Sequence, residues 1–136
     1  MNPVSPNCLA PSKKPYHTII PGFLTKNNEA VGPFGVMGGF MQPQGHVQVI
    51  SNMIDFGMNP QEALDAPRWQ WTKGKTVQVE QGVPNHIANG LSARGHDIQM
   101  LPDTGTFGRG EMIVRTEHGT LAGATESRTD GSVAAW

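Results

Sequence analysis

The chain has 136 residues, a formal net charge of −1 and a charged fraction of 15%, against roughly 25% in an ordinary globular domain. Its Lys and Arg residues are scattered and form no basic stripe, so a nucleic-acid partner is not expected. Its apolar runs last only a few residues, far short of the about 20 needed to span a membrane, so no membrane partner is expected.

The first part of the chain predicts a β-hairpin that follows an extended approach segment. Residues 1–14 contain three prolines, which favour extended backbone over helix. Strand-like sequence follows at 17–25 and again at 31–36. The polar stretch 26–29 between them is typical of a turn, so the two strands are expected to pair.

A helical pattern extends over residues 46–56. Its apolar side chains cover about half of the helical wheel, and Gly57 supplies a typical stop signal. An apolar arc this wide must pack against another layer, and we expect Val47, Ile50 and Ile54 to face the sheet. The apolar residues of this segment are Val47, Val49, Ile50, Met53, Ile54 and Phe56.

The second half of the chain predicts shorter elements. Asn59, Pro60 and Glu62 form the start signal of a short helix with a capping box, and Pro67 ends it. Further elements are a strand at 76–80, a helix at 84–94, a strand at 97–101, and a hairpin of 111–116 with 120–125. This order predicts an α+β fold, with a mostly antiparallel sheet and helices packed on it, in a single domain over 1–136.

The most informative segment for function is the glycine pair Gly38-Gly39, which lies between the second predicted strand and the main helix. Adjacent glycines let the backbone approach a bound group without side-chain obstruction. Their N–H groups, near a helix start, can point at developing negative charge, as in an oxyanion hole. A plain glycine-rich turn is the alternative interpretation of the same residues.

Other kinds of site find little support. The five histidines lack ligand spacing and the single cysteine, Cys8, excludes a thiolate zinc site, so neither a metal nor a cofactor is expected. Cys8 is expected to be a small buried residue. The glycine cluster at 105–110 lacks the ending of a phosphate-binding loop, and no serine lies in a nucleophile elbow. The sequence therefore offers an oxyanion-type backbone site without an identifiable nucleophile.

Several motifs, in their order and spacing, together resemble the γ-glutamyltranspeptidase family. The motifs are Pro15-Tyr16-His17-Thr18-Ile19-Ile20-Pro21, then Met37-Gly38-Gly39, then Ile54-Asp55-Phe56-Gly57-Met58-Asn59, then Ala63-Leu64-Asp65-Ala66-Pro67-Arg68, and finally Gly123-Ala124-Thr125-Glu126-Ser127-Arg128. The likeness extends from about Cys8 to the end of the chain.

This resemblance implies an N-terminal nucleophile hydrolase with an αββα sandwich, made when a precursor cleaves itself into large and small subunits. The nucleophile of that family is the new N-terminal threonine of the small subunit. The chain resembles the C-terminal part of that subunit, so the threonine is expected upstream of Met1. We therefore expect the isolated chain to be inactive, and its partners to be the rest of the small subunit and the large subunit.

The resemblance also assigns candidate site residues. Gly38 and Gly39 are expected to form the oxyanion hole, and His17, Thr18 and Met37 to contact the substrate. Many members carry two serines in place of His17 and Thr18, and proline in place of Met37. The implied reaction is acyl transfer from a γ-glutamyl amide such as glutathione to water or an amino acid. Two alternatives remain: a related amidase or acylase with another acyl group, and an inactive fragment that acts only by binding.

Overall fold

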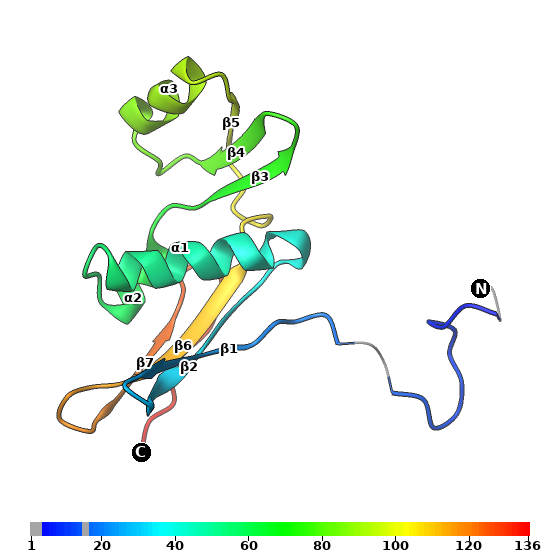
Figure 1. The fold of residues 1–136 in the computed structure, drawn as a ribbon, viewed down its shortest axis with the longest axis vertical. Coiled ribbons are helices and arrows are strands. Elements are labelled where there is room, and N and C mark those ends of the chain that lie inside the picture. The colour runs from blue at the N-terminus through cyan, green and yellow to red at the C-terminus, as the bar shows by residue number, and fades with distance from the viewer. Residues whose placement is uncertain (1–3, 15–16) are drawn as a thin grey trace.

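The computed structural model describes residues 4–14 and 17–136. Its strands form two sheets, and helices pack beside them (Figure 1). In chain order the elements are β1 (Gly22–Lys26), β2 (Glu29–Met37), the 3₁₀ helix η1 (Gly39–Met41), α1 (Gln42–Ile54), α2 (Pro60–Asp65), β3 (Trp69–Lys73), β4 (Thr76–Glu80), α3 (Asn85–Ala93), β5 (Asp97–Leu101), β6 (Arg109–Arg115) and β7 (Leu121–Thr125).

The larger sheet has the order β1-β2-β6-β7, and all its neighbouring strands are antiparallel. Asn27 and Asn28, with φ of 54° and 65°, form the tight turn between β1 and β2. This confirms the predicted N-terminal and C-terminal hairpins and places them in one sheet. The first strand is shorter than predicted, because it begins at Gly22, and residues 17–21 form no strand.

The smaller sheet has the order β3-β4-β5. β3 and β4 form an antiparallel hairpin around Gly74, whereas β4 and β5 pair in parallel. A parallel pair needs a long crossover, and α3 supplies it. The predicted strands at 76–80 and 97–101 and the helix between them are confirmed, as is the mostly antiparallel α+β class. The division into two sheets was not foreseen.

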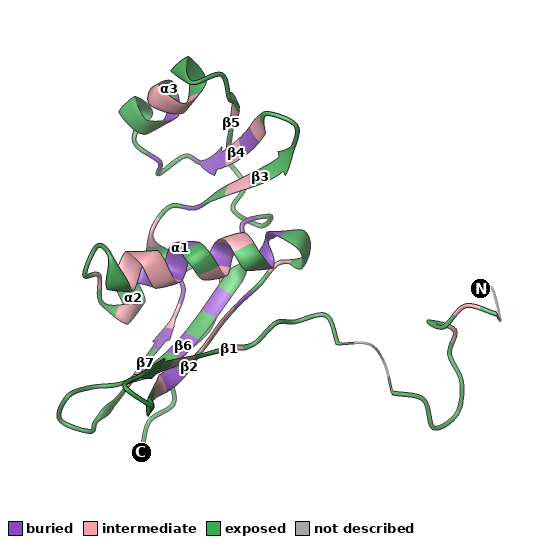
Figure 2. Cartoon of the chain, in the orientation of Figure 1, coloured by how far each residue is buried: buried purple, intermediate pink, exposed green. Residues whose placement is uncertain are grey.

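Helices α1 and α2 lie on one face of the larger sheet, α1 across β2 and α2 against β6 and β7 (Figure 1). Helix α2 begins with the predicted capping box, in which Asn59 Oδ1 accepts the Glu62 N–H at 2.9 Å and Glu62 Oε2 accepts the Asn59 N–H at 3.0 Å. The core lies between these helices and the sheet, as the purple segments of Figure 2 show. Its buried residues are Val36, Met41, Val49, Ala63, Leu64, Met112 and Ala124.

The prediction for the buried face of α1 is wrong for Val47 and Ile54, whereas Ile50 is half-buried. Val47 and Ile54 are 62% and 68% exposed, while Gly45, Gln48 and Val49 are buried. At Gly45 the helix comes close to the sheet, since a Cβ there would lie 2.9 Å from the Val36 side chain. The pattern had assumed that every apolar residue of this helix faces the same layer. In this chain the apolar residues at seven-residue spacing instead form an outer stripe, which consists of Phe40, Val47 and Ile54.

Two glutamines of α1 hold the edge strand of the smaller sheet. Gln48 accepts the Trp69 N–H and donates to the Trp69 carbonyl, each at 2.9 Å. Gln44 accepts the Trp71 N–H at 2.7 Å and donates to its carbonyl at 3.1 Å. Four residues of helix rise about 6.0 Å and two residues of strand about 6.6 Å, so the two side chains match alternate strand residues. They satisfy an edge that would otherwise be open.

A buried ionic cluster forms a second joint between the two sheets. Arg68, just before β3, pairs with Glu126, just after β7, and Arg128 pairs with Glu80 of β4. Both guanidinium groups also donate to the Leu64 carbonyl at the end of α2, at 3.1 and 2.9 Å. Burial raises the pKa of the Glu126 carboxyl and lowers that of Arg68, although each charge favours the ionised form of the other.

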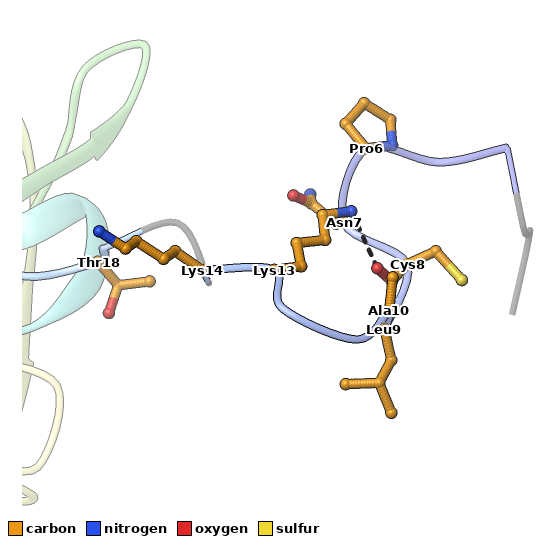
Figure 3. Close-up of a pocket in the computed structure, with 8 residues that line it drawn as sticks. All are labelled: Pro6, Asn7, Cys8, Leu9, Ala10, Lys13, Lys14 and Thr18. Carbon is orange, nitrogen blue, oxygen red and sulfur yellow. Dashed lines mark hydrogen bonds between the residues drawn. The ribbon is translucent and has the colours of Figure 1, made fainter.

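The arm before the sheet forms a hollow of its own (Figure 3). Lys13 Nζ donates to the Cys8 carbonyl at 2.9 Å and closes a turn. The Cys8 sulfur points away from the sheet, and the residue is half-buried, so the prediction of a buried cysteine is wrong. Residues 1–3 of the predicted extended segment lie outside the described residues; its described part contains turns but no helix or strand.

Candidate active site

The glycine pair lies where β2 meets η1. Gly38 caps η1 and Gly39 is its first residue. Gly39 has a φ of +61°, in the left-handed region that favours glycine. A Cβ on Gly38 would lie 2.9 Å from the Cα of Gly108, so the loop before β6 leaves no space for a side chain there. Both positions therefore require glycine, for different reasons.

The carbonyl groups around this turn determine where its N–H groups point. The Gly38 carbonyl accepts the Met41 N–H at 3.2 Å, so it points along the helix. In a planar trans peptide the next N–H points the opposite way, which directs the Gly39 N–H out of the helix start. The Met37 carbonyl lies toward Gly108, so the Gly38 N–H points away from β6 by the same reasoning. The first N–H groups of a helix have no acceptor inside it, so the N–H groups of Gly38 and Gly39 donate to none of the described residues of η1.

Gln42, the first residue of α1, connects this turn to the segment before β1. Its Nε2 donates to the Thr18 carbonyl at 2.7 Å and to the Gly39 carbonyl at 3.2 Å. Its Oε1 accepts the Ile20 N–H at 3.1 Å. The side chain is 6% exposed, and both of its amide hydrogens are used. The structure thus brings the predicted residues Thr18 and Gly39 together through a residue that the sequence did not single out.

His17 and Thr18 are exposed in this segment. The Nδ1–H of His17 donates to the Ile19 carbonyl at 3.0 Å and folds the imidazole back on its own backbone. Thr18 is attached to the turn by its backbone carbonyl, and its side chain lies at the surface. The substrate contacts of both residues remain a prediction.

Met37 is directed away from the other candidates. It alternates with Val36, whose side chain faces α1, so Met37 lies on the opposite face of the sheet. There it lines a cavity of about 570 Å³ with Ile19, and with Arg109 opposite it in the strand register. Neither Gly38 nor Gly39 lines this cavity.

His46 stabilises the end of β2 from within α1. Its Nε2 accepts the Val36 N–H at 3.0 Å, and its ring packs on Phe34 with centroids 5.0 Å apart. Burial lowers the pKa of His46, and a ring nitrogen that accepts an N–H carries no proton. His46 is therefore a partly buried, neutral histidine that supports the end of β2.

The sequence analysis did not identify Gln42, because its position in the sequence is only a weak indication of a special role. A polar residue three positions after a glycine pair, at the start of a helix, is ordinary for an exposed first turn. Its burial depends on residues 18–20 lying across it, which no local pattern indicates. Among residues 4–14 and 17–136, no group of three His, Cys, Asp or Glu residues could hold a metal ion. None of the described helices is long and apolar enough to cross a bilayer.

Comparison with known proteins gives consistent matches over this whole arrangement. The family model of gamma-glutamyltranspeptidase matches residues 1–136. The glutathione hydrolase-like YwrD proenzyme of Bacillus subtilis is 32% identical over 134 residues, and the oxamate amidohydrolase proenzyme of Klebsiella pneumoniae is 35% identical over 135. These alignments cover 93% and 94% of this chain, which spans about a quarter of the length of each relative, 25%.

Solved structures give the same picture. Cephalosporin acylase from Bacillus halodurans matches 99% of this chain with a TM-score of 0.85 and 65% identity, and the match covers 25% of that protein. Gamma-glutamyltranspeptidase from Pseudomonas nitroreducens matches 96% of this chain and 68% of its own, with a TM-score of 0.76. At 21% identity the second likeness shows the fold alone.

Proposed function

This chain belongs to the γ-glutamyltranspeptidase family, and we propose that it is the C-terminal portion of an amide-cleaving acyltransferase or hydrolase of that family. Its part in the reaction is the oxyanion site at Gly38 and Gly39. The observation that carries the proposal is the geometry of the turn: the Gly38 carbonyl accepts the Met41 N–H, so the planar peptide directs the Gly39 N–H out of the helix start.

The reaction has two acyl-transfer steps. A nucleophile from the part of the protein outside these residues attacks the amide carbonyl carbon, and the π electrons move to the oxygen. The N–H groups of Gly38 and Gly39 donate to this oxygen, whose charge grows only in the transition state. Collapse of the intermediate breaks the C–N bond, and the amine leaves with the proton that the nucleophile has lost. Water or an amino acid then attacks the acyl group, the bond from the acyl group to the nucleophile breaks, and the attacking molecule returns a proton to the nucleophile.

The exposed apolar side chains support the proposal that another part of the complete protein packs on this chain. The outer stripe of α1 includes Phe40, which is fully exposed, and Phe56 beyond the helix is 72% exposed. Apolar side chains that gather on one helix face mark an interaction surface. The relatives are proenzymes about four times longer than this chain, so the remaining three quarters of such a protein can cover the stripe.

We place a γ-glutamyl amide first as the acyl donor and a different acyl group second. The second candidate rests on the 65% identity to cephalosporin acylase, against 32% to the glutathione hydrolase-like YwrD proenzyme. His17 and Thr18, which stand where many family members have two serines, are the residues whose geometry distinguishes the two. A third outcome is a chain that binds its partner without any reaction.

A substrate panel on the complete protein tests this proposal. Release of the chromophore from γ-glutamyl, glutaryl and unsubstituted acyl anilides would be followed at equal enzyme concentration. We expect turnover of at least one anilide, and preference for the γ-glutamyl compound identifies the first candidate. Preference for another acyl group identifies the second. No release from any anilide by correctly folded protein would contradict both and leave the binding role.

A further inference from the structure

We propose that Gln42 is the positioning residue of this site: its side-chain amide locks the substrate-contacting segment 17–20 onto the oxyanion turn. The proposal rests on the proposed function for its catalytic meaning. Its structural basis is independent, because it consists of three hydrogen bonds from one buried side chain to backbone groups of two separate segments.

Segment 17–20 is joined to the start of α1 by hydrogen bonds and takes no part in the sheet. It lies before β1 and forms neither helix nor strand. The side chains of Ile19 and Ile20 are exposed by 52% and 38%, so apolar packing holds them only in part. The contacts of Gln42 with the Thr18 carbonyl and the Ile20 N–H therefore set the path of this backbone over the helix start.

The other half of the lock lies at Gly39. Its carbonyl accepts both the backbone N–H and the side-chain Nε2 of Gln42. Because one of the two bonds comes from the backbone, the turn keeps its orientation when the side chain is removed. Loss of the side chain should therefore release segment 17–20 much more than it disturbs the glycine pair.

This asymmetry predicts a specific kinetic signature. If segment 17–20 holds the substrate in ground and transition states alike, its release raises KM and leaves kcat nearly unchanged. Loss of the two bonds to that segment corresponds to an increase in KM of about two- to tenfold for each bond. A general loss of stability would instead lower the amount of active enzyme and with it the apparent kcat.

The test compares Gln42→Leu with Gln61→Leu in the complete protein. Gln61 is the control, since its Nε2 also donates to a backbone carbonyl, that of Thr125 at 2.8 Å, in β7, which lies two strands away from β2. We would measure amide hydrogen exchange of the peptide containing Ile20, together with kcat and KM on the preferred anilide.

We expect Gln42→Leu to speed exchange at Ile20 about tenfold or more and to raise KM, while Gln61→Leu changes neither. Unchanged exchange at Ile20 in Gln42→Leu overturns the lock, whether or not the protein is an enzyme. Faster exchange with unchanged KM overturns the positioning role. If the wild-type protein is inactive on every anilide, the proposed function is wrong and the positioning role fails with it. Hydrogen exchange at Ile20 still tests the hydrogen bonds of Gln42 in that case, so the two failures are distinguishable.

Discussion

The two sheets of this chain are held together by different physical means. The larger sheet packs on α1 and α2 through fully buried apolar side chains such as Val36, Val49 and Leu64. The smaller sheet has a core of only Val77, Val79 and Val83, with Ile98 beside it. It is joined to the rest by the paired amides of Gln44 and Gln48 and by the ionic cluster of Arg68, Glu80, Glu126 and Arg128.

The difference between the two sheets shows which contacts stabilise the candidate site and which contacts orient it. Apolar packing is non-directional and resists separation of layers, whereas hydrogen bonds fix orientation. Helix α1 takes part in both kinds of contact, and η1 connects it to the glycine pair. The apolar core of the larger sheet therefore supplies most of the stability. The hydrogen bonds of Gln44 and Gln48 and the ionic cluster fix the orientation of α1, which follows the glycine pair.

The largest expected effect comes from the ionic cluster. Arg68→Met leaves the Glu126 carboxyl buried with one distant guanidinium, since Arg128 Nη1 is 3.7 Å away, and it removes a donor from the Leu64 carbonyl. Breaking a buried pair at one partner typically costs about 3–5 kcal/mol of unfolding free energy. Urea unfolding measures it. Arg94→Met, which loses only a bond to Gly90 within its own exposed helix, is the control and should cost far less.

The apolar core of the larger region gives the next effect. Leu64 has no exposed surface, so Leu64→Ala should cost about 2–5 kcal/mol in the same unfolding experiment. Ile54 lies on the outer stripe, and Ile54→Ala in this chain should change stability by less than about 0.5 kcal/mol. A large loss for Ile54→Ala in the isolated chain would mean that the stripe is packed after all.

The outer stripe also allows a comparison between the chain and the complete protein. If the rest of the protein covers Ile54, the same substitution should cost about 2–5 kcal/mol in the complete protein. An equally small cost in both would show that the stripe stays uncovered, and would remove one support for the proposed partner.

The hydrogen bonds from the glutamines of α1 to β3 should contribute less to the free energy of unfolding. Gln48→Leu leaves the Trp69 N–H and carbonyl without their partners, at a cost of about 1–3 kcal/mol, and exposes the edge of β3 to exchange. Hydrogen exchange of the peptide containing Trp69 is the readout. Gln99→Leu is the control, since its amide reaches only the neighbouring Asp97 side chain at 3.3 Å. Equal exchange in both variants would show that the hydrogen bonds of Gln48 do not hold the strand.

The smallest effect is a dependence on pH. The pKa of His46 is lowered by burial from its ordinary value of 6.5, so the folded state binds the proton less readily than the unfolded state. Its contribution to stability is thus present above pH 6.5 and is lost as the pH falls below that value. His46→Gln, which keeps an acceptor for the Val36 N–H, should flatten this slope. The exposed His86→Gln should leave it as in the wild type.

Local signals predicted most elements of the fold. The turn at Asn27 and Asn28 and the capping box at Asn59 and Glu62 each depend on a few neighbouring residues, and these elements were predicted correctly. What failed depends on distant contacts. The apolar arc of α1 could not show which part of it faces the sheet, because the larger sheet and β3 contact different sides of that helix and its outer stripe is exposed.

The same distinction applies to the site. The glycine pair could be found from sequence, because two adjacent glycines at a strand–helix junction imply a close approach of the backbone. Gln42 could not, because its role arises only when residues 18–20 cross it. The role of the pair as an oxyanion hole, and those of His17, Thr18 and Met37 as substrate contacts, stay predictions that activity must test.

In the proposed function the Gly39 N–H stabilises the oxyanion, so deletion of that one hydrogen is the sharpest test. Proline is unsuitable, because the φ of +61° at Gly39 is outside its range. Semisynthetic replacement of the peptide N–H by an ester oxygen at Gly39 removes the donor and keeps the conformation. The same replacement at Gly57, another left-handed glycine with a φ of +67°, is the control. We expect kcat to fall by a factor of about 10²–10³ for the ester at Gly39 and to stay unchanged for the ester at Gly57. An unchanged kcat at Gly39 in the folded, complete protein would contradict this role of the Gly39 N–H.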